Sequence, residues 1–344
     1  MNISKILFVG LGGAGQRHLR IFHSILGNSC SYFAYRSSAK KVPFLNPNFS
    51  VDNNSTLESR YDLKSFNSLD KALNERPDLV VISNPTSLHI DIAIKSAQKG
   101  ISVFIEKPFA CSLDRFNEFR ELASNNNINF FISYQRRYHP LITKIKKLID
   151  CNKIGKIISG AFFVSSFLPS WHPYEDFREL YAANADLGGG VLLTEIHEID
   201  LTYFFFGLPK SVFCSGGNLG SYPMDVEDTA HLILRYEKFS IQLCISFIKR
   251  LPKRSFFLEG TEGAIDLDLF LNKMVTYNYT ENEITKEEDF LTNFSTDDLF
   301  QLQAKSFLFN NISLDENLKT AFGSLKIVEA AKISMQDRRE IDIT

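Results

Sequence analysis

A glycine-rich turn near the start of the chain constrains the fold more than any other feature of the sequence. The apolar residues 6–9 are followed by Gly10, Gly12 and Gly15, and then by a helix-period segment. In a strand–turn–helix unit, Gly10 allows a tight turn, Gly12 lets the backbone approach a pyrophosphate and Gly15 permits close helix–strand packing. The segment predicts a dinucleotide-binding α/β unit, and a purely structural glycine turn is the alternative.

Length and composition exclude several other classes of protein. A chain of 344 residues exceeds what one hydrophobic core usually holds, so two domains are expected. The net charge of −2 gives no basic surface for nucleic acid. No apolar run approaches the roughly 18 residues of a membrane span, and the N-terminus lacks the layout of a signal peptide. We expect a cytoplasmic protein with no nucleic-acid or membrane partner. Its five scattered cysteines include no C-x-x-C pair, which argues against a disulfide framework and a metal site.

The order of apolar segments predicts the architecture. Strand-like runs alternate with helix-period segments as far as residue 134, which is typical of a doubly wound parallel sheet. The expected strands are residues 6–9, 32–34, 79–82, 103–105 and 130–132. Beyond residue 134, β-rich segments follow one another closely and predict a large, open, mostly antiparallel sheet. The polar run 280–289 is interpreted as a loop or hairpin end, and helices are expected at residues 296–310 and 318–336.

The residues about twenty positions after the glycines bear on which cofactor is preferred. An acidic residue there would hold the ribose 2′-hydroxyl of NAD, but the chain has Arg36, Ser37 and Ser38. A guanidinium and two hydroxyls suit a 2′-phosphate, so NADP is favoured over NAD. An exposed arginine with NAD held by other contacts is the alternative.

Two further segments follow predicted strands of the same sheet. Asn84, Pro85, Thr86 and His89 could line the cofactor crevice, or this segment could simply cap the next helix. Glu106-Lys107-Pro108 ends the following strand. A lysine at that position can hold a substrate oxygen and stabilise negative charge developing on it, whereas the alternative is an edge lysine paired with Glu106.

A single histidine follows three glycines in the second half of the chain. His197 is expected one or two turns into a helix that begins after residue 190, with Thr194 on the same face. A histidine is suited to accept a hydroxyl proton as hydride leaves the carbon. Taken alone, such a histidine is more often a core residue whose hydrogen bonds are satisfied within the protein. A metal ligand is poorly supported because Leu201 stands where a second histidine would be needed.

Together, the glycine turn with His18, Glu106-Lys107-Pro108, residues 135–140 and residues 188–200 resemble the Gfo/Idh/MocA oxidoreductase family. The resemblance spans nearly the whole chain and implies an N-terminal Rossmann domain (residues 1–134). It also implies a substrate and oligomerisation domain (residues 135–344) whose open sheet forms a homodimer or homotetramer. Lys107 would orient the substrate and His197 would be the general acid/base. The cofactor-binding residues would be Gly10, Gly12, Gly13, Ala14, Gly15, Arg36, Ser37, Ser38, Asn84, Pro85, Thr86, His89 and Glu106.

The substrate side departs from the family pattern at one place. Many members carry an aspartate three or four residues before the histidine, whereas this chain has Thr194 with Glu195 beside it. Glu195 would then support the proton relay, or the relay would be weakened. The aromatic and charged segment 171–181 resembles members that act on nucleotide-linked sugars or nonulosonic acids in surface-polysaccharide synthesis. The expected substrate-binding residues are Arg136, Tyr138, Trp171, Arg178, Thr194 and Glu195.

These observations predict an NAD(P)-dependent oxidoreductase acting on a CH–OH group of a sugar. An epimerase that oxidises and re-reduces such a sugar with bound cofactor is one alternative. A non-catalytic cofactor-binding regulator is another, because fold alone does not establish catalysis.

Overall fold

A computed structural model describes residues 3–36, 43–172, 175–310 and 313–343. The chain divides into two compact units, of which unit 1 comprises residues 1–133 and 296–322, and unit 2 comprises residues 134–295 and 323–344. The sequence predicts one boundary after residue 134. It does not predict the return of residues 296–322 to unit 1.

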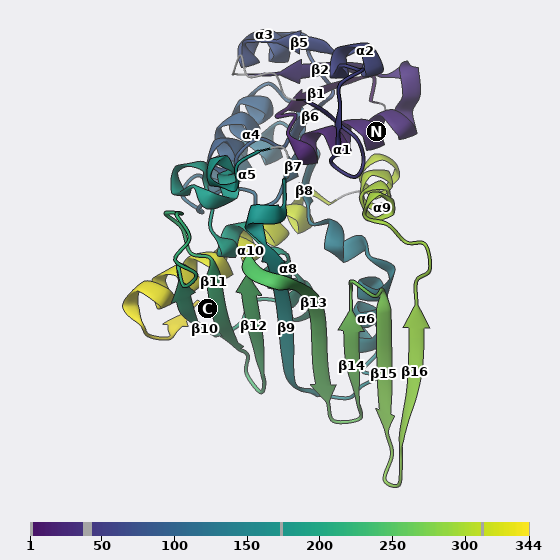
Figure 1. Ribbon diagram of the computed structural model, residues 1–344, viewed down its shortest axis with the longest axis vertical. Helices are drawn as coiled ribbons and strands as arrows, with labels where there is room; N and C mark the ends of the chain where they lie inside the picture. Colours follow the sequence, from purple (N-terminus) through teal and green to yellow (C-terminus); the bar gives the residue numbers. More distant parts are fainter. Residues whose placement is uncertain (1–2, 37–42, 173–174, 311–312, 344) are drawn as a thin grey trace. The chain divides into compact units, whose positions relative to one another are not determined.

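Unit 1 is built on a six-stranded parallel sheet (Figure 1). In spatial order the strands are β5 (Lys64–Phe66), β2 (Ser31–Tyr35), β1 (Lys5–Val9), β6 (Leu79–Ile82), β7 (Ser102–Glu106) and β8 (Phe130–Ser133). The chain enters at β1, builds outward to β5 and then continues on the other side from β6. The direction of winding therefore reverses between β1 and β6, where doubly wound sheets bind ligands.

Helices and short elements surround this sheet. They are α1 (Gly13–Leu26), β3 (Phe44–Leu45), β4 (Val51–Asp52), α2 (Leu57–Tyr61), α3 (Leu69–Asn74), α4 (His89–Gln98), α5 (Phe116–Asn125) and α9 (Thr296–Phe309). Phe104 packs at the centre, with its ring centroid 5.5 Å from that of Phe22 on α1 and 5.3 Å from that of Phe307 on α9. The late helix α9 is thus part of the core of unit 1.

Unit 2 carries a nine-stranded sheet in which every neighbouring pair is antiparallel except β9 and β12 (Figure 1). In spatial order the strands are β16 (Ile284–Phe290), β15 (Lys273–Tyr279), β14 (Gly263–Asp268), β13 (Ile248–Gly260), β9 (Ile157–Phe167), β12 (Ser240–Ser246), β11 (Thr229–Arg235), β10 (Ser211–Gly217) and β17 (Ile341–Asp342). The predicted fold class is confirmed. The expected loop at 280–289 is wrong in part, because residues 284–290 form an edge strand whose polar side chains are mostly exposed.

One face of the large sheet is buried beneath helices. These are α6 (Pro140–Asp150), α7 (Val191–Thr194), α8 (His197–Phe206) and the second part of α10 (Leu314–Asp337). Phe162 on β9 stacks on Phe256 of β13 at 4.4 Å and approaches Phe205 of α8 at 6.4 Å. Alternate residues point to the opposite face, where Phe163 and Phe257 are exposed.

Candidate functional site

The glycine turn between β1 and α1 has a geometry that admits only glycine at two of its positions. Gly10 has a φ of +87°, and a Cβ there would lie 2.6 Å from the Asn84 backbone nitrogen. A Cβ on Gly15 would lie 2.1 Å from the Gly10 carbonyl oxygen, whereas a Cβ on Gly12 would meet nothing within 4 Å. The turn is therefore closely packed on the inside and open at Gly12.

The N-terminus of α1 is prepared for an anion. Gly12, its N-cap, offers no side-chain oxygen to the amides of Gly13 and Ala14, and the first turn contains no acidic residue. Uncapped amides at the positive end of a helix bind phosphate groups well. Together with the open space beside Gly12, this end of unit 1 fits the pyrophosphate of a dinucleotide.

Arg36, just after β2, has a partner that the sequence pattern does not reveal. Its guanidinium lies 3.1 Å from the carboxylate of Glu58 on α2, and the Ser65 hydroxyl donates to the same carboxylate oxygen at 3.0 Å. An acidic group therefore stands beside Arg36, brought there from another element. The predicted partners Ser37 and Ser38 lie outside the described residues.

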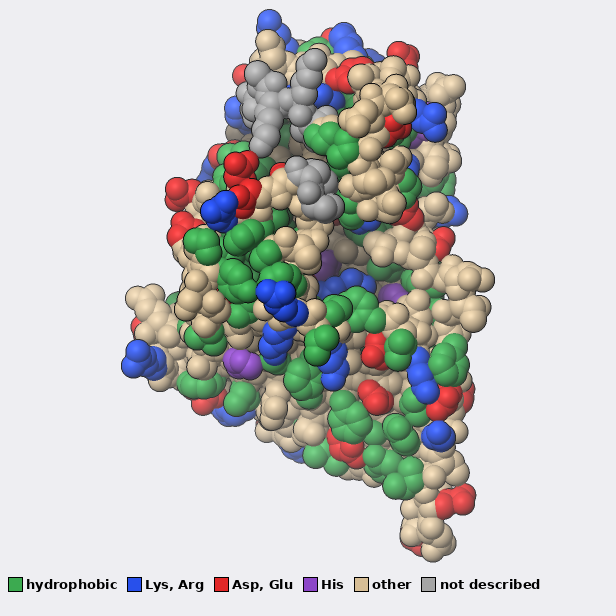
Figure 2. Space-filling view, in the orientation of Figure 1, with side chains coloured by type: hydrophobic (Ala, Val, Ile, Leu, Met, Phe, Trp, Pro, Cys, Tyr) green, Lys and Arg blue, Asp and Glu red, His purple; other side chains and the backbone are tan. Residues whose placement is uncertain are grey.

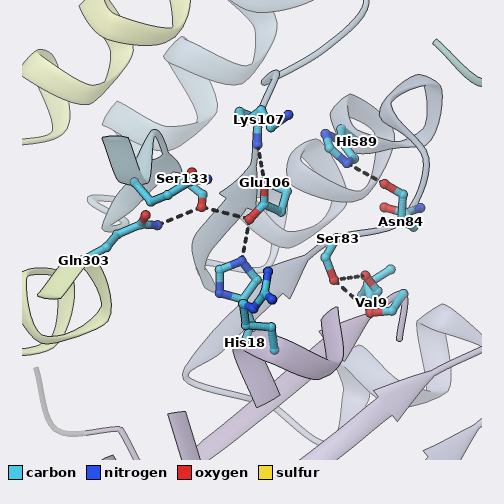
Figure 3. A network of polar contacts seen from close by, with 12 residues as sticks. Val9, His18, Ser83, Asn84, His89, Glu106, Lys107, Ser133 and Gln303 are labelled. Carbon is cyan, nitrogen blue, oxygen red and sulfur yellow. Dashed lines mark hydrogen bonds and ion pairs between the residues drawn. The ribbon is translucent and has the colours of Figure 1, made fainter. Parts of the chain in front are cut away.

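The loop after β6 is tied to the loop after β7 through the buried His89, whose contact with Asn84 is drawn in Figure 3. The two ring nitrogens of His89 each lie 2.8 Å from a backbone carbonyl oxygen, one of Pro108 and the other of Asn84. Burial lowers the pKa of His89, although both carbonyls favour the protonated ring. Both nitrogens of the His89 ring are thus occupied by contacts within the protein. The Asn84 Oδ1 atom is buried and has no hydrogen-bond partner among the described residues, and Thr86 is also buried.

Lys107 is anchored through its neighbour Glu106 (Figure 3). One carboxylate oxygen of Glu106 lies 2.5 Å from His18 and accepts from the Ser133 hydroxyl at 2.9 Å; the other accepts the Lys107 N–H at 3.1 Å. Gln303 of α9 donates to Ser133 at 2.7 Å. Burial alone would raise the pKa of Glu106, but the hydrogen bond and charge of His18 and the Lys107 ammonium hold it below its ordinary value. The site therefore contains a carboxylate held by His18 and Ser133 through one oxygen, while the other oxygen binds the backbone N–H of Lys107.

In unit 2, the three glycines shape the approach to His197. Gly190 has a φ of +95°, and a Cβ there would lie 2.4 Å from a Glu227 carboxylate oxygen, which accepts the Leu192 N–H at 3.1 Å. The short helix α7 ends at Thr194, and α8 begins at His197. The expectation of one continuous helix is wrong, because Glu195 leaves helical geometry (φ −100°, ψ 34°) and separates the two.

His197 is buried and lies against the segment that begins unit 2. The Gln135 amide nitrogen is 3.3 Å from the His197 Nε2 atom, and the Tyr134 ring meets the imidazole edge-on at a centroid distance of 6.1 Å. The sequence motifs did not identify Gln135 by itself as a site residue. It could have been found from its position in the 135–140 motif, directly after a strand.

One turn further along α8, a buried ion pair also links this helix to residues 135–138. Arg137 donates to both carboxylate oxygens of Asp200 at 2.8 and 2.7 Å, and the Ser324 hydroxyl donates to Asp200 at 2.9 Å. Burial raises the pKa of Asp200, while Arg137 pulls it down. The segment 135–138 is therefore held to α8 at two points.

Glu195, the expected support for His197, is bound to another residue. Arg254 on β13 donates to Glu195 at 2.5 Å and its Nε atom lies 2.8 Å from Glu198. Thr194, the residue that precedes Glu195, is also buried. Burial, with the charge of Arg254, lowers the pKa of Arg136 to about 9. Glu195 and Glu198 are thus both paired with Arg254.

The remaining predicted substrate residues are spread along unit 2. Arg178 is exposed, and among the described residues its hydrogen bonds go to Asp176. Trp171 meets Phe247 edge-on at 6.3 Å, and Tyr138 ends the 3-10 turn Gln135–Tyr138.

The described residues contain no helix with the length and apolar character to span a bilayer. They also contain no group of three or more His, Cys, Asp or Glu side chains arranged to hold a metal ion.

Both halves of the chain match known family models. Residues 4–134 match "Oxidoreductase family, NAD-binding Rossmann fold", and residues 142–266 match "GFO/IDH/MocA C-terminal domain".

Several known proteins are similar to this chain. A 2,7-anhydro-N-acetylneuraminate hydratase of Mediterraneibacter gnavus is 26% identical, covering 68% of this chain and 62% of that protein. A levoglucosan dehydrogenase of Pseudarthrobacter phenanthrenivorans is 24% identical over 75% of this chain and 73% of its own. The chain spans less than two thirds of the hydratase and of an uncharacterized oxidoreductase of Streptococcus pneumoniae (61%).

Solved structures share the fold along the whole chain. Levoglucosan dehydrogenase with NADH and L-sorbose aligns with a TM-score of 0.84 at 15% identity, covering 99% of both chains. The WlbA dehydrogenase of Bordetella pertussis, in complex with NADH and UDP-GlcNAcA, aligns with a TM-score of 0.79 at 19% identity, covering 100% of this chain and 99% of WlbA.

Proposed function

The chain belongs to the Gfo/Idh/MocA oxidoreductase family, and we propose that it is an NAD(P)-dependent oxidoreductase acting on a CH–OH group of a sugar. One observation carries the proposal. A helix N-terminus open to a pyrophosphate and a lysine fixed by a buried carboxylate stand at the same, carboxyl-terminal edge of one parallel sheet. That edge is where doubly wound sheets place cofactor and substrate.

The proposed roles follow from the chemistry of the side chains. Gly10, Gly12, Gly13, Ala14 and Gly15 would hold the pyrophosphate, and bound NAD(P) would supply the hydride acceptor or donor. In the oxidation direction, His197 accepts the hydroxyl proton. The Lys107 ammonium stabilises the negative charge that develops on the substrate oxygen. In reduction each role is reversed.

The proposal extends to the cofactor preference. Arg36 is suited to a 2′-phosphate and favours NADP, as a guanidinium binds phosphate in a planar fork. The Glu58 carboxylate at 3.1 Å already neutralises much of that charge. We therefore expect a modest preference for NADP over NAD, with Asn84, Pro85 and Thr86 lining the cofactor site.

A nucleotide-activated sugar or a nonulosonic acid of surface-glycan synthesis is the substrate class that we favour. This choice is supported by relatives named for a UDP-sugar complex and for an anhydro-neuraminate. Arg136, Tyr138, Trp171, Arg178, Thr194 and Glu195 are the proposed substrate-side residues. Because the reaction draws on a nicotinamide cofactor, we also propose a cytoplasmic location.

We further propose that the open face of the large sheet joins subunits into a homodimer or homotetramer. Figure 2 shows hydrophobic side chains gathered over this sheet. Phe163, Phe213, Ile233 and Phe257 are each 38% to 44% exposed, and strand register places them on one face. Light scattering of wild type and of Ile233→Lys tests this: a wild-type monomer would contradict it.

The experiment on function uses the purified full-length protein with NAD⁺ or NADP⁺ and a panel containing UDP-GlcNAcA, 2,7-anhydro-N-acetylneuraminate and levoglucosan. Formation of reduced cofactor is measured together with product stereochemistry. We expect Lys107→Ala and His197→Ala to abolish turnover while cofactor affinity is retained. Stoichiometric cofactor turnover would exclude the epimerase. Absence of turnover on the whole panel, with cofactor bound, would favour the regulator.

A further inference from the structure

Gln135 occupies a position next to His197 that has chemical consequences. It is only 8% exposed, and its amide nitrogen lies 3.3 Å from the His197 Nε2 atom. An amide NH₂ group can only donate hydrogen bonds, whereas a neutral imidazole has one donor nitrogen and one acceptor nitrogen. The nitrogen that faces the amide must therefore be the acceptor.

The contact is held in place by the buried ion pair next to it. Gln135 and Arg137 are two residues apart in the turn Gln135–Tyr138, and their partners His197 and Asp200 are three residues apart on α8. The bidentate bond from Arg137 to Asp200 thus fixes the register in which Gln135 meets His197. The Ser324 hydroxyl bonds the same carboxylate from α10.

We propose that Gln135 is a positioning residue that keeps His197 as the tautomer with its proton on Nδ1 and a lone pair on Nε2. The inference rests on the proposed function, in which His197 accepts a substrate proton. A base must present a lone pair, and the hydrogen bond to its other side commonly sets the tautomer. Here the donor sits on the accepting nitrogen itself. At 3.3 Å this hydrogen bond is long, so a substrate hydroxyl displaces it easily.

The Gln135 Oε1 atom is a second reason to assign Gln135 to the active site. It is buried and has no hydrogen-bond partner among the described residues. A buried acceptor without a partner is costly unless a ligand satisfies it. A hydroxyl or N–H group beside the reacting carbon of the substrate completes it.

Other charged groups lie on the elements around His197 in unit 2. They are Arg136 and Arg137 on the preceding turn, Glu195, Glu198 and Asp200 on its own segment, and Arg254 on β13. None of them is changed in the variants below, so a difference between variants reports on residue 135.

The test is ¹⁵N NMR of the full-length protein labelled at histidine, because the two ring nitrogens report tautomer and titration directly. His197→Gln assigns the signals. In the wild type we expect the proton on Nδ1. Gln135→Glu replaces the donor by an acceptor, so the proton should move to Nε2 and the imidazole titration midpoint should rise by about one pH unit or more. Gln135→Met matches the length of the side chain without a donor and should yield a mixture of tautomers.

A wild-type proton on Nε2, or a tautomer and midpoint unchanged in both variants, would overturn the proposal. A merely structural role for Gln135 would leave the tautomer unchanged in a Gln135→Met variant that folds, and circular dichroism checks folding. The NMR result needs no substrate. If the tautomer behaves as expected but no sugar is turned over, the proposed function fails and the role of Gln135 in setting the tautomer stands.

Discussion

Replacing Arg137 by methionine should destabilise unit 2 strongly. The guanidinium is the cationic partner of Asp200, whose side chain is fully buried. Methionine keeps an apolar stem of similar length but lacks the guanidinium, whose carbon lies 4.7 Å from the Phe204 ring centroid. The variant therefore removes the charge together with both hydrogen bonds to Asp200, leaving this carboxylate with the Ser324 hydroxyl as its remaining donor among those described.

The size of the effect follows from the burial of the pair. Removing one partner of a buried ion pair typically costs about 3–5 kcal/mol, because the other charge stays buried without compensation. With a urea m-value of about 2–3 kcal/mol/M, the unfolding midpoint should fall by roughly 1–2.5 M.

The sequence contains one tryptophan, Trp171, and it lies in unit 2. Its fluorescence during urea titration therefore follows the unit that contains the ion pair. Lys210→Met is the matched control, because Lys210 forms an exposed pair with Glu237 in the same unit and should leave the midpoint nearly unchanged.

The pH dependence gives a second check on the same reasoning. Burial raises the pKa of Asp200 and Arg137 opposes that shift, so the pKa should rise further in Arg137→Met. A carboxyl whose folded pKa lies above its unfolded value loses stability as pH rises through that interval. The cost of the substitution should be largest at neutral pH and shrink in acid. A midpoint shift no larger than that of Lys210→Met, or an Arg137→Met/Asp200→Asn double variant whose loss equals the sum of the single losses, would refute the argument.

Three further outcomes are expected in unit 1. Gly15→Ala should abolish NADP binding measured by calorimetry, because its Cβ would lie 2.1 Å from the Gly10 carbonyl oxygen; retained affinity would contradict the packing argument. Glu58→Gln should tighten NADP about threefold or more without changing NAD, since Arg36 is released from a carboxylate; parallel changes for both cofactors would count against it. Glu106→Gln should lower the melting temperature by roughly 5–10 °C through loss of the buried charge beside His18, and an unchanged melt would show that this charge is dispensable.

Much of the fold could be predicted because buried parallel strands are continuous apolar runs. The strand expected at residues 79–82 has those bounds in the structure, and those expected at 6–9 and 130–132 differ by one residue. The strand β16 was missed because it lies at an edge of the sheet, where its polar side chains face water and obscure the period of two.

The site was only partly accessible from sequence. The motifs single out Lys107 and His197. Lys107 directly follows a predicted strand, and His197 follows three glycines that precede a predicted helix. The partners of other predicted site residues come from elsewhere in the chain, as with Glu58 beside Arg36 and Arg254 beside Glu195. Such pairings depend on tertiary packing, which no local pattern encodes.

The late return of α9 to unit 1 has a consequence for how the chain is made. Gln303, which donates to Ser133 in the network around Glu106, lies 170 residues further along the chain, and Asp297 binds Arg17 and Arg20 of α1 from the same helix. On the ribosome, the nucleotide-binding half must wait for nearly the entire polypeptide before its own interior is finished. An expression fragment cut after residue 134 would lack that final layer, so a minimal version of this half needs α9 joined back to it by a linker.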